Sequence, residues 1–219
     1  MKEKIAKYFN DIREKEKNQN VNSIIRNSIM ILILGVFLGI FSKWLDQLQI
    51  NNSIGWMNLI EKMDLNNFFS NMAIWLFIGL AIAIYSKSPK NASIYVFLFF
   101  LGMCTSYHLY TIYFAGFNPK NYMMTWYGIT CLSPIFAYLT WYSKSEKKES
   151  IILSSLILFV MFASCFNVGM WYFEPRSILY TLTFIMTIIV LYKKPLNMGI
   201  SFFIGFILAI FIKIPFISG

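Results

Sequence analysis

Residues 24–45 read IIRNSIMILILGVFLGIFSKWL, an apolar run whose charged residues, Arg26 and Lys43, stand close to its two ends. A helix needs about 20 mostly apolar residues to cross the hydrocarbon layer of a bilayer. The run is too long for the apolar region of a secretory signal, and no small-residue cleavage site follows it. It therefore predicts a membrane-spanning helix that stays in the mature protein.

The composition of the whole chain favours the same class of protein. Hydrophobic residues make up 58% of the 219 residues and charged residues 13%, whereas soluble domains average about 45–50% and about 25%. A soluble fold of this size would leave large apolar patches in water. The aromatic content of 19% also suits a membrane protein, because Trp and Tyr concentrate at membrane–water interfaces.

Further apolar segments follow the first, and each ends at Pro, Gly, Asn or charged residues, as turns between helices do. They cover residues 68–86, 91–115, 122–142, 151–173, 177–192 and 198–217. The sequence thus predicts an all-α, polytopic transmembrane bundle of seven spans, folded as a single domain over residues 24–219. The segment 177–192 is short, which leaves open six spans, or a re-entrant hairpin formed by residues 177–217.

The distribution of positive charge predicts the orientation. The segments 1–26, 86–90, 143–150 and 192–197 hold 14 of the 19 Lys and Arg residues, and they alternate with poorly charged loops. Basic loops stay in the cytoplasm, so we expect the N-terminus inside, the C-terminus outside and residues 1–23 as a charged cytoplasmic segment. The basic residues form short clusters between apolar runs, without base-stacking aromatics beside them, which argues against nucleic acid as a partner.

Two amphipathic elements are expected beside the spans. Ile5, Tyr8, Phe9 and Ile12 recur at helical intervals among Lys and Glu, which predicts a short helix lying on the inner leaflet, with its lysines against anionic lipid. A solvated charged tail is the alternative. Residues 50–63 also show a helical apolar spacing, and we expect an interfacial helix there, on the outer face, with Trp56 as an anchor.

Polar and aromatic residues gather toward the outer half of several expected spans. Polar groups at membrane depth are costly without partners and often mark function, so this asymmetry predicts an outward-facing cavity that binds a small molecule. The alternative is an ordinary aromatic belt with hydrogen-bonded packing residues. The candidate cavity residues are Asn71, Trp75, His108, Tyr110, Trp126, Asn167 and Trp171.

Two ion pairs are expected at the outer surface. Lys43 and Asp46 are three residues apart on one helix face, and Glu174 and Arg176 flank Pro175 in a tight turn. In the first span, Gly35 and Gly39 lie on the face of Lys43 and allow a neighbouring helix to approach closely.

Motifs for membrane-embedded catalysis are missing from the sequence. There is one histidine, and no paired carboxylates, HExxH or phosphate-binding loop lies in the spans. Cys104, Cys131 and Cys165 lie inside apolar segments without CxxC spacing, so we interpret them as small hydrophobic residues. We expect no enzyme activity, no cofactor and no metal.

These features lead to a small membrane component for transport or substrate binding that depends on a partner for energy. In size and character it is similar to the substrate-binding membrane subunits of vitamin uptake systems in Gram-positive bacteria, which usually have six spans. The short basic loops offer a docking place for a membrane or cytoplasmic protein. The heavy use of Ile, Lys and Asn suggests an AT-rich bacterial genome, and therefore the bacterial plasma membrane.

Two alternatives remain at this point. An accessory, immunity or assembly factor would bind another membrane protein through a lipid-facing stripe of small residues, such as Gly35 with Gly39 or Gly205 with Ala209. A membrane-embedded transferase acting on lipid would need His108 or Glu174 as its base.

Overall fold

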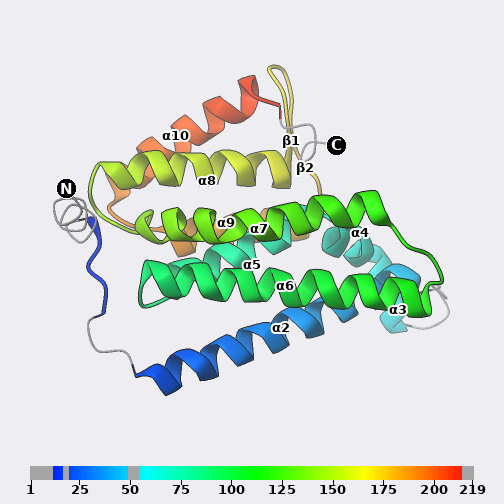
Figure 1. The fold of residues 1–219 in the computed structure, drawn as a ribbon. Coiled ribbons are helices and arrows are strands. Elements are labelled where there is room, and N and C mark those ends of the chain that lie inside the picture. Colours follow the sequence, from blue (N-terminus) through cyan, green and yellow to red (C-terminus); the bar gives the residue numbers. More distant parts are fainter. Residues whose placement is uncertain (1–11, 17–19, 49–54, 214–219) are drawn as a thin grey trace.

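Apolar runs between turn residues become long helices in the computed structural model, which describes residues 12–16, 20–48 and 55–213 (Figure 1). Side chains at the ends set several boundaries: Asn20 accepts a hydrogen bond from the backbone N–H of Asn22, and Ser88 accepts one from Asn91, just before Pro89. The helices are α2 (Val21–Gln47), α3 (Gly55–Lys62), α4 (Leu65–Ser70), α5 (Met72–Tyr85), α6 (Pro89–Phe114), α7 (Lys120–Tyr142), α8 (Glu149–Cys165), α9 (Ile178–Leu191) and α10 (Pro195–Phe211). The described chain is therefore all-α apart from one short hairpin.

Two of the expected helices are interrupted. The segment 68–86 was expected to be one helix, but it breaks at Asn71, whose backbone is extended (φ −93°, ψ 160°) between α4 and α5. The segment 151–173 is helical only as far as Cys165. It continues as a β-hairpin in which β1 (Phe166–Val168) pairs antiparallel with β2 (Phe173–Pro175). The prediction of single helices over these two segments is therefore wrong.

Local chemistry explains the hairpin. Phe166 and Val168 are buried and Asn167 between them is exposed, which is the two-residue alternation of a strand. The turn is closed by the backbone N–H of Gly169, which donates to the carbonyl oxygen of Tyr172 at 2.9 Å. Aromatic and β-branched residues favour strands, and here they outweigh the apolar character that suggested a longer helix.

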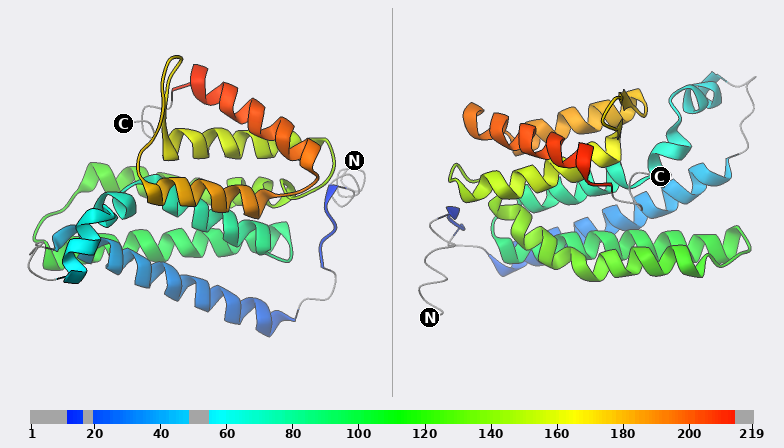
Figure 2. Two further views of the ribbon diagram at one scale, coloured as in Figure 1. Left: turned by 180° about the vertical axis from the view of Figure 1, so that it is seen from behind. Right: turned by 90° about the horizontal axis from the view of Figure 1, so that it is seen from above.

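The helices pack as two groups that share α5 (Figure 2). The first group joins α2, α6 and α7 around a core that includes Phe99, Trp126 and Trp141. The second joins α8, α9 and α10 around a core that includes Phe162 and Phe184. From α5, Trp75 and Ala83 belong to the first core and Ala73, Leu80 and Ile84 to the second.

Glycines allow α2 and α6 to lie unusually close. A Cβ atom on Gly35 would stand 2.3 Å from the carbonyl oxygen of Phe99, and one on Gly39 would stand 2.4 Å from that of Met103. Similarly, a Cβ atom on Gly205 would stand 2.9 Å from the carbonyl oxygen of Ser155 in α8, and Ala209 is buried. The close approach predicted from Gly35 and Gly39 is confirmed. The prediction that these small-residue stripes face lipid is wrong, because both are used inside the molecule.

Large apolar side chains cover the sides of the bundle. They are exposed on α2, α6, α7, α8, α9 and α10, with Phe37, Phe136 and Phe203 each more than 60% exposed. By length and composition, α2 and α6 could each cross a membrane, whereas α5, α8, α9 and α10 are shorter apolar helices of 10–17 residues. These features indicate association with a membrane.

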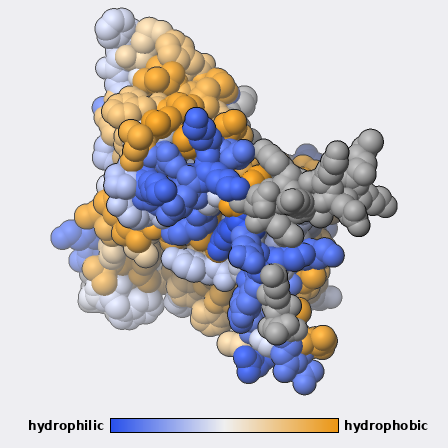
Figure 3. Space-filling view, turned by 90° about the vertical axis from the view of Figure 1, so that its left-hand side faces the viewer, coloured by the Kyte–Doolittle hydropathy of each residue, from blue (hydrophilic) through white to orange (hydrophobic). Residues whose placement is uncertain are grey.

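One end of the bundle collects the basic segments that were expected to share a side of the membrane. Figure 3 looks onto this end, where hydrophilic residues gather, with hydrophobic residues on the flanks. Lys87 pairs with Glu16 at 3.0 Å and Lys194 with Glu146 at 2.7 Å, so loops far apart in the sequence meet here. We call this the basic end and the opposite one the hairpin end.

The two flanking elements are described in part. Ile5, Tyr8 and Phe9 of the expected N-terminal helix lie outside the described residues, whereas Ile12 packs against the first core. Of the interfacial helix expected over 50–63, the structure describes α3, which buries none of its residues and leaves Trp56 half exposed.

Candidate functional site

A cavity of about 280 Å³ lies between the hairpin and the end of α10. We call it the hairpin cavity. Its lining residues are Ala163, Phe166, Asn167, Val168, Tyr172, Glu174, Arg176, Ala209, Ile212 and Lys213. Apolar walls with a few convergent polar groups are typical of small-molecule sites.

The pairing of the two strands puts the polar side chains of the hairpin, Asn167 and Glu174, opposite each other. Both are exposed, while the side chains on either side of Asn167 turn into the core. Phe173 stacks on Phe166 with ring centroids 4.7 Å apart and meets Phe206 of α10 edge-on at 5.7 Å. The hairpin is thus anchored to α10, and its polar face is held toward the cavity.

Two cations line the hairpin cavity together with the carboxylate of Glu174. Nη2 of Arg176 donates to the carbonyl oxygen of Ala163 at 3.5 Å, near the C-terminus of α8. Nζ of Lys213 donates to the carbonyl oxygen of Val168 and stands 5.8 Å from the ring centroid of Tyr172. The lining therefore carries more positive than negative charge. The ion pair expected between Glu174 and Arg176 stays a prediction.

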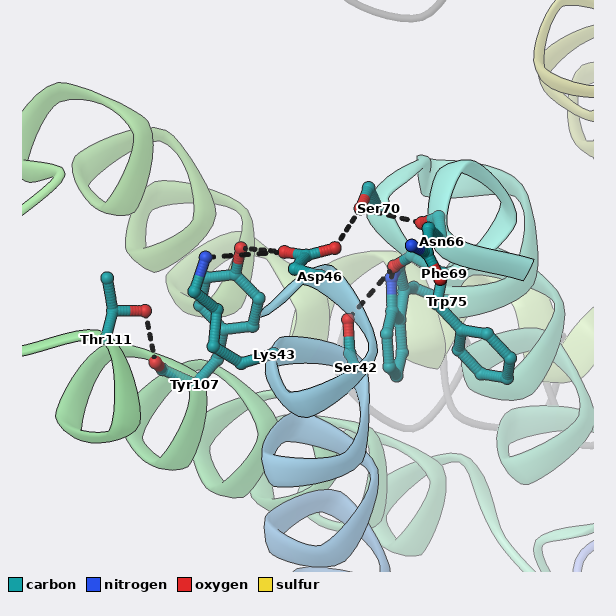
Figure 4. Close-up of polar contacts among 9 residues, drawn as sticks. All are labelled: Ser42, Lys43, Asp46, Asn66, Phe69, Ser70, Trp75, Tyr107 and Thr111. Carbon is teal, nitrogen blue, oxygen red and sulfur yellow. Dashed lines mark hydrogen bonds and ion pairs between the residues drawn. The ribbon is translucent and has the colours of Figure 1, made fainter. Parts of the chain in front are cut away.

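A second polar cluster joins α2, α4 and α6 at the hairpin end of the bundle (Figure 4). The carboxylate of Asp46 accepts hydrogen bonds from the hydroxyls of Ser70 and Tyr107, at 2.7 and 2.9 Å, and lies 3.5 Å from Nζ of Lys43. The ammonium of Lys43 also stands 5.2 Å from the centroid of the Tyr107 ring. Because donors from three helices converge on Asp46, the cluster serves to hold the ends of these helices together.

Beside this cluster lies a cavity of only about 10 Å³, lined by Ser42, Phe69, Trp75, Met103, Cys104, Tyr107, Tyr122, Met123 and Trp126. That is room for about one water molecule. The Nε1–H donor of Trp75 is already used, since it donates to the carbonyl oxygen of Phe69 at 2.9 Å. The Nε1–H of Trp126 is buried without an acceptor of good geometry, and Tyr122 is the hydroxyl-bearing neighbour.

The residues proposed for one outward cavity lie in several places. Trp75 and Trp126 line the small cavity and Asn167 lines the hairpin cavity. Asn71 forms the junction of α4 and α5, Tyr110 packs on Phe114 with ring centroids 4.7 Å apart, and Trp171 is 92% exposed near the tip of the hairpin. The structure therefore does not bring the seven candidates together.

His108 acts as a packing residue between α6 and α7. Its Nδ1 lies 3.1 Å from the hydroxyl oxygen of Tyr127 and its Nε2 lies 3.0 Å from Oδ1 of Asn118. These two hydrogen bonds tie α6 to α7 and to the loop that joins the two helices. Within the described part of the chain, no group of three or more His, Cys, Asp or Glu side chains could hold a metal ion.

Sequence reasoning missed Arg176 and Lys213 as cavity residues. Arg176 was assigned to a tight turn, and Lys213 lies within the expected span 198–217. Gly169 and Pro175 are the signal that could have revealed the hairpin, because Gly favours tight turns and Pro is tolerated on edge strands.

Three basic side chains at the basic end, Arg13, Lys144 and Lys193, bind backbone carbonyl oxygens near helix ends. Arg13 donates to the carbonyl oxygens of Ile84 and Trp141, and Lys144 donates to that of Val190. Lys193, 7% exposed, donates to the carbonyl oxygens of Ser143 and Ser150 at 3.2 and 2.9 Å and to the hydroxyls of Ser150 and Ser154 at 2.7 and 2.8 Å. Cations at C-termini complement the negative ends of the helix dipoles, so these side chains are occupied within the fold.

Burial changes the titration of these cations. It lowers the pKa of Arg13, and it lowers the pKa of Lys144 with a further contribution from the positive charge of Arg13. Burial, followed by the charge of Lys144, lowers the pKa of Lys193 to about 8.

Because the basic side chains at the other end are bonded within the fold, the candidate site with open volume is the hairpin cavity. Comparisons of the chain with protein-family models, with curated proteins and with solved structures find no match.

Proposed function

We propose that this chain is a multi-span protein of the bacterial plasma membrane that binds a small molecule from outside, as the substrate-binding component of a transport system. The observation that carries the proposal is the hairpin cavity, with its apolar wall, its two cations and its position at the end opposite the basic loops. No energy-coupling motif accompanies it in the sequence, so a partner would supply the energy.

The lateral surface supports the membrane part of the proposal. Exposed apolar residues lie along six helices, while charged loops meet at one end. A bilayer would cover the first and leave the second in water. The proposed spans are α2, α5 with α4, α6, α7, α8, α9 and α10, with the basic end in the cytoplasm.

Two of the proposed spans, α5 and α9, are shorter than the hydrocarbon layer that they would cross. Helices α5 and α9 have 14 residues each and are therefore about 21 Å long, less than the roughly 30 Å of a hydrocarbon core. Helix α5 is packed inside the bundle, between the two cores. Helix α9 leaves one side exposed and is joined to α4 by the hydroxyl of Tyr180, which donates to the carbonyl oxygen of Asn67. Interrupted backbone is tolerated at membrane depth where protein surrounds it.

Cysteine accessibility tests the orientation. Cys104 and Cys165 are buried, so replacing the exposed Cys131 with Ala gives a quiet background. In that background, Lys120→Cys should react with a membrane-impermeant maleimide on intact cells, and Lys147→Cys should react only after permeabilisation. The reverse pattern would overturn the orientation, and reaction of both sites on intact cells would overturn the multi-span arrangement.

Ligand retention tests the binding function. The full chain is purified in mild detergent and denatured, and released small molecules are identified by mass spectrometry. Asn167→Trp fills the hairpin cavity from an exposed position, and Trp171→Asn alters the same hairpin outside that lining. We expect a molecule from the wild type and from Trp171→Asn that Asn167→Trp lacks. Equal retention by all three proteins, or none by the wild type, would contradict the proposal.

A further inference from the structure

We infer that the hairpin cavity takes an anionic amphiphile, whose acid group lies between Arg176 and Lys213 and whose apolar part enters from the outer leaflet. This inference rests on the proposed function and names the chemistry of its ligand. Three features of the cavity carry it: the sign of its charge, the character of its wall, and the surface onto which the hairpin projects.

The charge of the lining selects against a cationic ligand. Among the described residues that line the cavity, two are cations, Arg176 and Lys213, and one is a carboxylate, Glu174. A guanidinium and an ammonium both form strong charge-assisted hydrogen bonds with phosphate or carboxylate. Lys213 donates to the carbonyl oxygen of Val168, and an ammonium has three N–H donors, so further donors remain for a ligand. An acid group therefore balances the excess positive charge.

The wall of the cavity suits hydrocarbon. Ala163 and Ala209 are small, and Phe166 and Val168 are largely buried residues of the second core. Cavities for drug-sized ligands measure about 300–1,000 Å³, so about 280 Å³ accommodates a small acid or the polar end of a larger amphiphile. Contact with both the cations and these apolar side chains requires a molecule with both characters.

The hairpin projects sideways from the end of α8, across the direction of the helices (Figure 1). Met170, Trp171, Tyr172 and Phe173 are all exposed on it. Trp and Tyr concentrate where hydrocarbon meets headgroups, so a hairpin with this tip lies at the level of the outer headgroups. A cavity beneath such a hairpin is reached from the leaflet as well as from water, which favours a lipid-derived acid over a freely soluble one.

Native mass spectrometry of the detergent-solubilised full chain tests this chemistry. The probes are dihexanoyl phosphatidylglycerol, dihexanoyl phosphatidylcholine and inorganic phosphate. Phosphatidylglycerol should bind the wild type about tenfold more tightly than phosphatidylcholine, because the choline cation cancels the charge that the site prefers. Phosphate alone should bind more weakly than phosphatidylglycerol. Equal affinity for the two lipids would overturn the anionic selectivity, and phosphate as tight as phosphatidylglycerol would overturn the need for an apolar part.

Substitutions locate the binding. Lys213→Gln and Arg176→Gln should each weaken phosphatidylglycerol binding about tenfold or more, and Asn167→Trp should abolish it while leaving both cations in place. Lys62→Gln, on the exposed helix α3, is the matched control and should change nothing. Because Arg176 also bonds to Ala163, thermal unfolding must show that Arg176→Gln is folded; Asn167→Trp and Lys213→Gln decide the matter if it is not. Binding that none of these variants alters would overturn the inference.

The two proposals fail in different ways. A neutral molecule that binds the wild type but not Asn167→Trp would overturn the anionic ligand and leave the hairpin cavity as a binding site. If no probe of any charge binds in a manner sensitive to Asn167→Trp, both are overturned.

Discussion

The guanidinium of Arg13 lies over the indole of Trp141, with its carbon 4.2 Å from the ring centroid, and its Nη1 donates to the backbone carbonyl oxygen of the same tryptophan at 2.6 Å. Its Nη2 reaches the carbonyl oxygen of Ile84 at 2.9 Å. One side chain from the N-terminal segment thus closes the C-terminal ends of α5 and α7. Arginine is suited to this because its planar fork presents donors in two directions and stacks on aromatic faces.

Arg13→Lys should therefore destabilise the bundle although it keeps the charge. A lysine ammonium is a point donor that cannot reach both carbonyl oxygens in the same geometry, and the free energy of unfolding should fall by about 1–3 kcal/mol. Thermal unfolding in detergent, followed by tryptophan fluorescence, measures the change. Arg26→Lys, at an exposed position of α2, is the control, and equal shifts for the two variants would refute the role of Arg13.

Trp141→Phe should cost stability through one hydrogen bond. Trp141 is 1% exposed, and its Nε1–H donates to the carbonyl oxygen of Ser86 at 2.7 Å. Phenylalanine leaves that carbonyl oxygen without this donor and a small void beside it, which should lower the free energy of unfolding by about 1–3 kcal/mol. Trp171→Phe, at the exposed tip, should leave the melting temperature unchanged within error. A larger loss at Trp171 than at Trp141 would contradict this assignment.

Gly39→Ala and Gly128→Ala should have opposite effects on stability. A methyl group on Gly39 meets the backbone of α6, so the two helices must separate, at a cost of about 1–3 kcal/mol. Gly128 has no atom within 4 Å of an added Cβ, and alanine is the better helix former by about 1 kcal/mol. Melting temperatures of the two purified variants check the prediction. It is wrong if Gly39→Ala is as stable as the wild type.

Lys193 should make stability depend on pH in the alkaline range. Its pKa in the folded chain is lowered to about 8 from the usual 10.5, first by burial and then by Lys144. Below pH 8 both the folded and unfolded chains carry the proton, and the cost of burying the charge is fully present. As the pH rises from about 8 toward 10.5, the folded chain releases its proton before the unfolded chain does, so the contribution of Lys193 to stability rises.

The comparison that isolates this effect is with Lys193→Met. The melting temperature of the wild type minus that of Lys193→Met should increase between pH 7 and pH 10. Lys194→Met removes the neighbouring lysine, which pairs with Glu146 at the exposed surface, and its difference from the wild type should stay nearly constant over the same range. A difference for Lys193→Met that is flat or falls with pH would contradict the lowered pKa.

The long helices could be predicted from the sequence because their signals are local. The run containing Gly35 and Gly39 forms α2 and packs closely on a neighbour, and Pro89 and Pro195 stand at the starts of α6 and α10. The apolar composition also predicted that the chain associates with a membrane. The break at Asn71 could not be predicted in this way, because an apolar run continues after it and its backbone is extended all the same.

The site was harder to predict because side chains at similar depth need not point to the same place. Asn71, His108, Trp126 and Asn167 lie on different elements, but each is turned by its own packing. Trp126 faces inward and Asn167 faces the hairpin cavity. Position along a helix predicts depth, and the direction of a side chain follows from tertiary contacts and from breaks such as the one at Cys165. The same holds for the lysines at the basic end: their number predicted an orientation of the chain, but the burial of Lys193 could not be predicted from it.

The sharing of α5 between two cores has a consequence for how the protein is made. When α2 to α7 have left the ribosome, one side of α5 can already pack against α6 and α7, while Ala73, Leu80 and Ile84 await partners that are encoded later. Helices α8, α9 and α10 then dock on this side of α5. Polar substitutions at Leu80 should therefore leave early membrane insertion intact and impair the late step, which protease protection of nascent chains of increasing length would reveal.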